Sequence, residues 1–173
     1  DKSKYNEGTK IVSGKSIYRG EDPGEGGHKI AHPGYYTHVA LLDVASMHPH
    51  SIIAMQCFGE YTSRFEELVN IRIAIKHGNY DEVAQLFDGK LRPYLTNKND
   101  AKNLSHALKT AINSVYGLTS ASFDNPFRDK RNINNIVALR GALFMVDLKH
   151  KVQEKGFTVV HIKTDSIKIA EPT

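Results

Sequence analysis

The chain has 173 residues, of which 40% are hydrophobic and 24% are charged, which is typical of a globular domain with its own core. Its single cysteine, Cys57, excludes an internal disulfide and a zinc site built from cysteines, and it favours a reducing, cytoplasmic compartment. The net charge of +4 suits a polyanionic partner without demonstrating one. Because no apolar run approaches the roughly 20 residues that span a bilayer, we expect no membrane insertion.

The first part of the chain predicts an arm, a strand and a short helix. Residues 1–34 contain seven glycines and two prolines and predict a loop-rich N-terminal arm with short irregular strands. The following YYTHVALLD becomes continuously apolar toward its end, which predicts a buried strand that ends at Asp43. A short helix is expected over MHPHSIIAMQ, with Ser46 as its N-cap and Pro49 in its first turn. Asp43 is therefore expected at a strand-to-helix corner.

The middle of the chain predicts helices. Residues 63–77 have helical apolar spacing and a stop at His77-Gly78, and a shorter helix is expected over residues 81–87. A long helix is expected from about residue 100 to residue 119. Its apolar stripe consists of Leu104, Leu108, Ala111, Val115 and Leu118.

The last part predicts another long helix over residues 132–155, ended by Gly156, and then two short strands, FTVVHIK and SIKIA. This order of elements predicts an α+β fold with a helical insertion. We expect residues 35–55 and 120–173 to form the α+β layer and residues 56–119 to form the inserted helices.

Polar side chains align on one face of the helix expected around residue 112. Lys109, Asn113 and Tyr116 are spaced i, i+4, i+7, so they project together. Ammonium and amide donors one turn apart suit phosphate oxygens, and the tyrosine ring offers a surface for a base. Arg72 and Lys76 repeat the i, i+4 pairing on the preceding helix, and two antiparallel helices would aim all four donors at one triphosphate.

Two aspartates stand in apolar sequence surroundings. Asp43 ends the predicted buried strand, and Asp165 lies at the bend between two apolar strands. Buried carboxylates are rare unless they are paired, and a divalent cation is a common reason to bring two together. Two Mg²⁺ ions stabilise both the attacking and the leaving oxygen of a phosphoryl transfer. The sequence therefore predicts that Asp43 and Asp165 are catalytic metal ligands in such a reaction.

Three ordered motifs resemble those of the family B, or alpha-like, DNA polymerases, particularly the phage members. DVASMHPHSI is similar to D-x-x-S-L-Y-P-S-I-I, KTAINSVYG matches K-x-x-x-N-S-x-Y-G throughout, and KTDS is similar to D-T-D-S. The resemblance implies a polymerase palm, an antiparallel sheet packed on helices, with the fingers inserted at residues 56–119. It also implies addition of a dNTP to a primer 3′-hydroxyl on template DNA, in the host bacterial cytoplasm for a phage enzyme.

The resemblance also implies roles for individual residues. Asp43, Asp165 and the backbone at Val44 would bind two Mg²⁺ ions, which Mn²⁺ can replace. The nucleotide-binding residues implied are Ser46, Met47, His48, Arg72, Lys76, Lys109, Asn113 and Tyr116. Those implied to contact primer or template are Gly117, Lys163, Thr164 and Ser166.

Two positions depart from the family pattern. His48 stands where the family has a tyrosine under the sugar, which leaves discrimination against ribonucleotides open. Lys163 replaces the first aspartate of D-T-D-S and adds a positive charge near the expected primer end. The similarity covers about residues 26–170 and includes no exonuclease or thumb motif. We therefore expect a palm and fingers core of a longer enzyme, weakly active or inactive by itself, that works with those missing regions or with other replication proteins.

Two alternatives stay open. Asp43, His48, His50, His161 and Asp165 have the ligand types of a zinc- or manganese-dependent hydrolase, although that reading leaves the triphosphate-like helix unexplained. A non-catalytic nucleic-acid-binding module that has kept the fold would also carry the basic residues.

Overall fold

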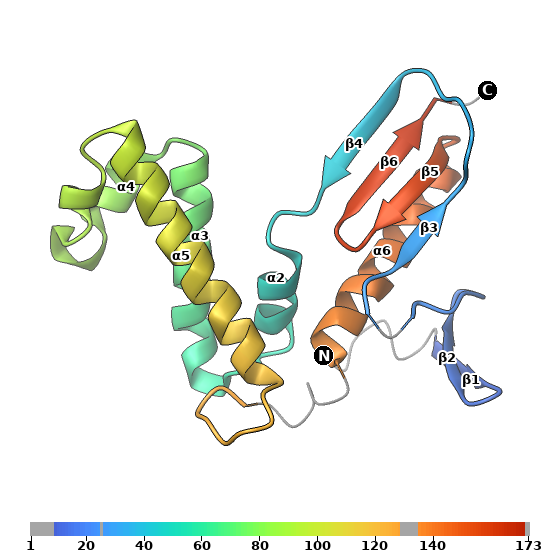
Figure 1. Ribbon diagram of the computed structural model, residues 1–173, viewed down its shortest axis with the longest axis horizontal. Helices are drawn as coiled ribbons and strands as arrows, with labels where there is room; N and C mark the ends of the chain where they lie inside the picture. The colour runs from blue at the N-terminus through green and yellow to red at the C-terminus, as the bar shows by residue number, and fades with distance from the viewer. Residues whose placement is uncertain (1–8, 25, 129–134, 172–173) are drawn as a thin grey trace. The chain divides into compact units, whose positions relative to one another are not determined.

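The computed structural model describes residues 9–24, 26–128 and 135–171. The chain divides into two compact units, residues 1–51 with 134–173 and residues 52–133. Across the described residues it contains five α-helices, a four-stranded antiparallel sheet and a separate two-stranded hairpin (Figure 1). The predicted α+β class is confirmed.

The four-stranded sheet belongs to the first unit and has the strand order β3-β5-β6-β4. Its strands are β3 (Lys29–Ala31), β4 (Val39–Asp43), β5 (Thr158–Lys163) and β6 (Ser166–Ala170). The predicted hairpin of β5 and β6 is confirmed, with Thr164 and Asp165 as its two-residue loop. Thr164 has a φ of 58°, the sign that such a loop requires at its first position. The glycine-rich arm supplies β3, an edge strand of this sheet.

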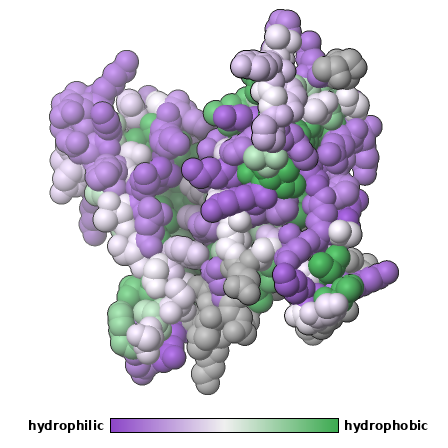
Figure 2. Space-filling view, turned by 45° about the vertical axis from the view of Figure 1, so that its right-hand side comes forward, coloured by the Kyte–Doolittle hydropathy of each residue, from purple (hydrophilic) through white to green (hydrophobic). Residues whose placement is uncertain are grey.

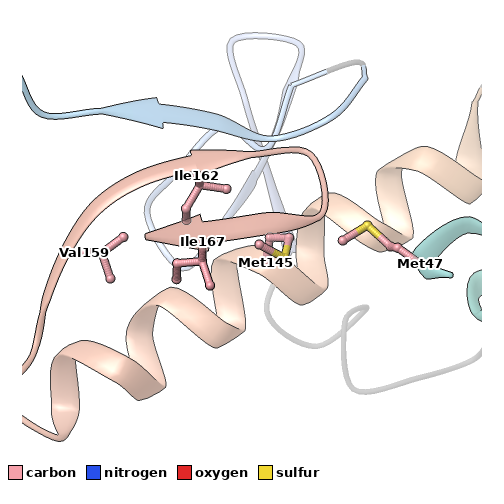
Figure 3. Packing of buried hydrophobic residues seen from close by; sticks show 5 residues of the cluster. All are labelled: Met47, Met145, Val159, Ile162 and Ile167. Carbon is pink, nitrogen blue, oxygen red and sulfur yellow. The ribbon is translucent and has the colours of Figure 1, made fainter. Parts of the chain in front are cut away.

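Helix α6 (Ile136–Glu154) covers one face of the sheet (Figure 1). A cluster of five buried side chains joins the helix to the hairpin and to the start of α2 (Met47–Ala54), and Figure 3 shows it. The cluster consists of Met47, Met145, Val159, Ile162 and Ile167. A methyl group on Gly141 of α6 would lie 2.5 Å from the Met47 sulfur, so alanine there would require the Met47 side chain to move.

Strand β5 contains one extra residue in its pairing with β6. Val159 pairs with Ile169 and His161 pairs with Lys168, so Val160 lies between them as a bulge. Because of this extra residue, Val159 and Ile162 both face α6 although they are three positions apart. His161 and Lys163 then point to the opposite, open face of the sheet.

Strand β4 is the other edge of the sheet, and the prediction that it is buried is wrong. All five of its residues are exposed, and Leu41 keeps 62% of its surface accessible. The cluster against α6 draws on β5 and β6 and contains no residue of β4. On the visible face in Figure 2, hydrophobic residues appear as separate patches among hydrophilic ones. No helix within the described ranges has the length and apolar character needed to cross a membrane.

The hairpin of β1 (Thr9–Val12) and β2 (Lys15–Tyr18) belongs to the same unit as α6. The Tyr18 hydroxyl donates to Asp147 of α6 at 2.7 Å, and Arg19 pairs with the same carboxylate at 3.4 Å. Lys149 of α6 pairs with Glu21 in the loop that follows β2. These polar contacts connect the N-terminal arm to α6.

The second unit is helical, with α3 (Thr62–Lys76), α4 (Tyr80–Gln85) and α5 (Lys98–Thr119). Helix α5 starts at Lys98 because the Asn97 side chain accepts bonds from the amides of Asn99 and Asp100, both at 2.9 Å. The predicted apolar stripe is confirmed for Leu104 and Leu108, which pack on the core of this unit. Farther along, the buried residue is Ile112 and not Ala111, which is exposed. The core of the unit is formed by Ile71, Ile75, Val83 and Ala101.

Candidate functional site

Asp43 and Asp165 lie at the same end of the sheet. Asp43 closes β4 opposite Ser166, and the next residue, Val44, donates its amide to the Asp165 carbonyl oxygen at 2.8 Å. Asp43 is exposed and Asp165 is half-buried. Burial therefore does not explain Asp43, contrary to the sequence-based argument. What brings the backbones of the two aspartates into neighbouring positions is the pairing of β4 with β6.

These carboxylates fit a hard cation that also takes ligands from a substrate. Mg²⁺ prefers oxygen ligands and commonly combines one or two carboxylates with phosphate oxygens and water. The exposure of Asp43 leaves space for such ligands. Across residues 9–24, 26–128 and 135–171, no three His, Cys, Asp or Glu side chains form a metal-binding group. Within those residues, a cation held at Asp43 and Asp165 would therefore take further ligands from a substrate or water.

His48 lies close enough to Asp165 for the charge of the carboxylate to affect the pKa of the imidazole. Burial lowers the pKa of His48 below its usual value, and the Asp165 carboxylate opposes that shift. His50, by contrast, is exposed, and its Nδ1 lies 2.9 Å from the Ser46 carbonyl oxygen of the preceding turn. His161 projects from the open face of β5. The five side chains considered for a hydrolase are therefore not gathered as one metal site among the described residues.

A row of side chains crosses the open face of the sheet beside Asp43. Lys29 is opposite Lys163, Lys163 is opposite Ser166, and Ser166 is opposite Asp43. Both lysines are exposed, and like charges directly opposite each other destabilise a sheet. With strands about 4.8 Å apart, Lys163 lies about 10 Å from Asp43 across the sheet. The exposed Lys168 adds a third cation to this face.

Gly27 supports the loop that carries Asp165. The Thr164 amide donates to the His28 carbonyl oxygen at 2.9 Å, and a methyl group on Gly27 would overlap the Thr164 side chain, with 2.9 Å to its Cβ. We expect Gly27→Ala to destabilise this unit by about 1–3 kcal/mol, because the loop must move to make room. Gly26→Ala is the matched control, since no atom lies within 4 Å of the added methyl group. Equal urea midpoints for the two variants would contradict this prediction.

The second unit contains a basic groove between α3 and α5. It has a volume of about 390 Å³ and brings together Arg72, Lys76 and Lys109. Asn113 lies one turn farther along α5 and is exposed, but it does not line the groove. The lining residues are Arg72, Ile75, Lys76, Tyr80, Lys98, Lys102, Asn103, Ser105, His106 and Lys109. None of these described lining residues is acidic.

Sequence reasoning missed Lys98, Lys102 and His106 as groove residues. Their spacing of i, i+4, i+8 places them on one face of α5, in line with Lys109. That spacing is visible in the sequence. Which helix packs against that face is not visible, and without a partner helix a row of lysines is typical of a solvated surface.

The charges on α3 are segregated. A second groove of about 280 Å³, between α3 and α4, is lined by Glu66, Glu67 and Glu82 and by none of the basic residues of the first groove. The same helix therefore presents cations to one groove and carboxylates to the other. An anionic ligand is attracted to the groove that contains Lys109 and repelled by its neighbour.

Tyr116 and Gly117 follow on the same helix. Tyr116 is half-buried, and burial raises the pKa of its hydroxyl, so the ring is neutral. A methyl group on Gly117 would meet no atom within 4 Å. A glycine inside a helix lowers helix stability by about 1 kcal/mol relative to alanine. Packing among the described residues does not explain why position 117 is a glycine.

The chain matches no protein-family model and has no significant match among curated proteins. The polymerase resemblance therefore rests on the three motifs. The structure itself shows two aspartates at one end of a sheet in the first unit and basic residues lining a groove between two helices in the second.

Proposed function

We propose that the chain is the core of a DNA polymerase, which adds a dNTP to the 3′-hydroxyl of a primer paired with template DNA. The observation that carries this proposal is the basic groove. Arg72, Lys76 and Lys109 were predicted from sequence as triphosphate donors, and all three line one groove that has no acidic lining residue. Cations that converge in this way suit a ligand with several adjacent phosphates.

In the proposed reaction, the primer 3′-hydroxyl loses its proton to water, and its oxygen attacks the α-phosphorus of the dNTP. The bond to the bridging oxygen of the β-phosphate breaks to release pyrophosphate. Mg²⁺ bound at Asp43, Asp165 and the Val44 backbone would neutralise charge on the attacking and leaving oxygens. Arg72, Lys76 and Lys109 hold the β- and γ-phosphates, where negative charge accumulates as pyrophosphate leaves.

The resemblance implies further nucleotide contacts, which belong to the proposal in each unit separately. Asn113 donates from the next turn of α5, and the neutral ring of Tyr116 packs near the base, with open space beside Gly117. The backbone of Ser46 and Met47 at the start of α2 cradles phosphate, and His48 takes the position beneath the sugar.

The open face of the sheet supports the DNA part of the proposal. Lys29, Lys163 and Lys168 offer cations to backbone phosphates, and contacts of this kind position a nucleic acid without reading its sequence. Thr164 and Ser166 flank Asp165 at the same end of the sheet. A non-catalytic binding module would use the same lysines but would not require Asp43 and Asp165.

Triphosphate binding tests the proposal directly. We expect Lys109→Ala to weaken the binding of a dNTP, measured by calorimetry with Mg²⁺, by about 10- to 100-fold, because a hydrogen bond to a charged group is worth about 1.5–3 kcal/mol. Lys90→Ala removes the same charge from an exposed lysine of the same unit that does not line the groove, and it should bind like the wild type. The proposal is wrong if the wild type binds no dNTP, or if the two variants bind it equally.

A further inference from the structure

We propose that Lys98, Lys102 and His106 form a second anion subsite in the basic groove, and that this subsite binds pyrophosphate. The inference rests on the proposed function, because pyrophosphate is the product that the proposed reaction releases. We call these three residues the outer subsite, and Arg72, Lys76 and Lys109 the inner subsite. All six line the same groove.

The length of the basic row exceeds what one triphosphate can occupy. Lys98 and Lys109 are eleven residues apart on an unbroken helix, which corresponds to about 16 Å along its axis. In a triphosphate, single bridging oxygens join the three phosphorus atoms, so the chain is compact. A triphosphate held at Lys109 therefore leaves the cations near the start of α5 without a phosphate ligand.

Lys98 and Lys102 lie where a positive charge destabilises an isolated helix. Lys98 is the first residue of α5 and Lys102 is one turn later, near the end of the helix where the backbone dipole disfavours positive charge. The two lysines are also like charges at i, i+4, which repel each other. An anion between them would offset both effects.

The acidic residue nearby is not paired with the lysines. Asp100 lies in the same helical turn, but its carboxylate accepts hydrogen bonds from Thr96 and Asn97. Within the part of the chain that the structure describes, neither Lys98 nor Lys102 forms an ion pair, and both are exposed. Both ammonium groups are therefore available to a ligand.

The lining favours a small polyphosphate over a nucleic-acid strand. Proteins that hold single strands stack the bases on accessible aromatic rings. Among the described lining residues, the one phenyl-type ring is that of Tyr80, which is half-buried and packs on the hydrophobic cluster of the helical unit. Asn103 and Ser105 add uncharged polar groups. The outer subsite thus offers charge and hydrogen bonds, and the small imidazole of His106 is its one exposed ring among the described residues.

The test compares pyrophosphate and dNTP binding by calorimetry at one ionic strength. With the inner subsite saturated by a dNTP, we expect the double variant Lys98→Ala/Lys102→Ala to bind inorganic pyrophosphate about tenfold more weakly than the wild type, while its affinity for the dNTP alone changes less than about twofold. The control Lys90→Ala/Lys155→Ala removes the same charge from exposed lysines outside the groove, and both affinities should stay unchanged. The thermal midpoint of the outer-subsite variant should be equal or higher without ligand, because repulsion within α5 is relieved.

Three outcomes have separate meanings. Wild-type pyrophosphate affinity in the outer-subsite variant would overturn the inference. Loss of affinity for a short single-stranded oligonucleotide, with pyrophosphate affinity unchanged, would also overturn it and assign these residues to nucleic acid. If pyrophosphate binding depends on Lys98 and Lys102 but no dNTP binds at Lys109, the anion subsite is supported and the proposed polymerase function fails.

Discussion

Asp165→Asn is expected to lower nucleotidyl transfer by at least about a thousandfold, and Asp43→Asn to lower it similarly. The substitution keeps the size of the side chain but replaces a carboxylate with an amide, which is a much weaker ligand for Mg²⁺. A thousandfold corresponds to about 4 kcal/mol of transition-state stabilisation. The affinity for a dNTP should fall far less, because the proposed triphosphate donors lie in the helical unit.

Single-nucleotide extension of a primer paired with a template, at saturating dNTP and Mg²⁺, measures this effect. It should be run both on this chain and on the full product of its gene, because we expect the core alone to be weakly active or inactive. Glu154→Gln is the control, since it neutralises an exposed carboxylate at the end of α6. Full activity of Asp165→Asn would refute the metal assignment. If the wild type extends no primer in either form and yet binds DNA, the binding-module alternative holds.

Ile162→Ala is expected to reduce the free energy of unfolding of the sheet unit by about 2–5 kcal/mol. Ile162 is fully buried, with 0% of its surface exposed, and it packs with Met145 and Ile167 between the hairpin and α6. Truncation removes buried apolar atoms and leaves a cavity that the sheet and helix do not readily close. Because Lys163 is the next residue and Asp165 follows in the loop, the proposed catalytic end should lose order as well.

Urea unfolding combined with hydrogen exchange of the β5 and β6 amides measures this loss within the sheet unit. Lys168→Ala serves as the matched control, because Lys168 lies on β6, points to the open face and is exposed. It should change stability by no more than about 0.5 kcal/mol. A loss below about 1 kcal/mol for Ile162→Ala would mean that this cluster is not the core of the unit.

Local sequence patterns predicted most of the elements. Apolar spacing located α3, α5 and α6, and the two short apolar runs around Thr164-Asp165 located the β5–β6 hairpin. The same pattern failed for β4, because a continuous apolar run indicates a strand but not whether it is central or at an edge. Strand β3 could not be predicted because three residues in a glycine-rich segment carry no alternation, and only the pairing with β5 makes them a strand.

The candidate site shows the same division between local and long-range information. The i, i+4, i+7 spacing predicted that Lys109, Asn113 and Tyr116 lie on one helix, and all three belong to α5. It did not predict that Asn113 lies outside the groove. The cross-strand row from Lys29 to Asp43 depends on the register of three strand pairs, which no local pattern contains. The metal-binding, DNA-binding and catalytic roles stay predictions.

The bulge at Val160 marks the position in β5 where one residue can be deleted without shifting the strand register. Removing one residue there leaves both faces of the sheet as they are, because Val159 and His161 already pair with successive residues of β6. A deletion at Ile162 would instead bring Lys163 into the buried place against α6. Strand β5 can therefore lose one residue at Val160 without changing its register with β6. Related sequences with a one-residue gap at this position would keep the same exposed and buried faces of the sheet.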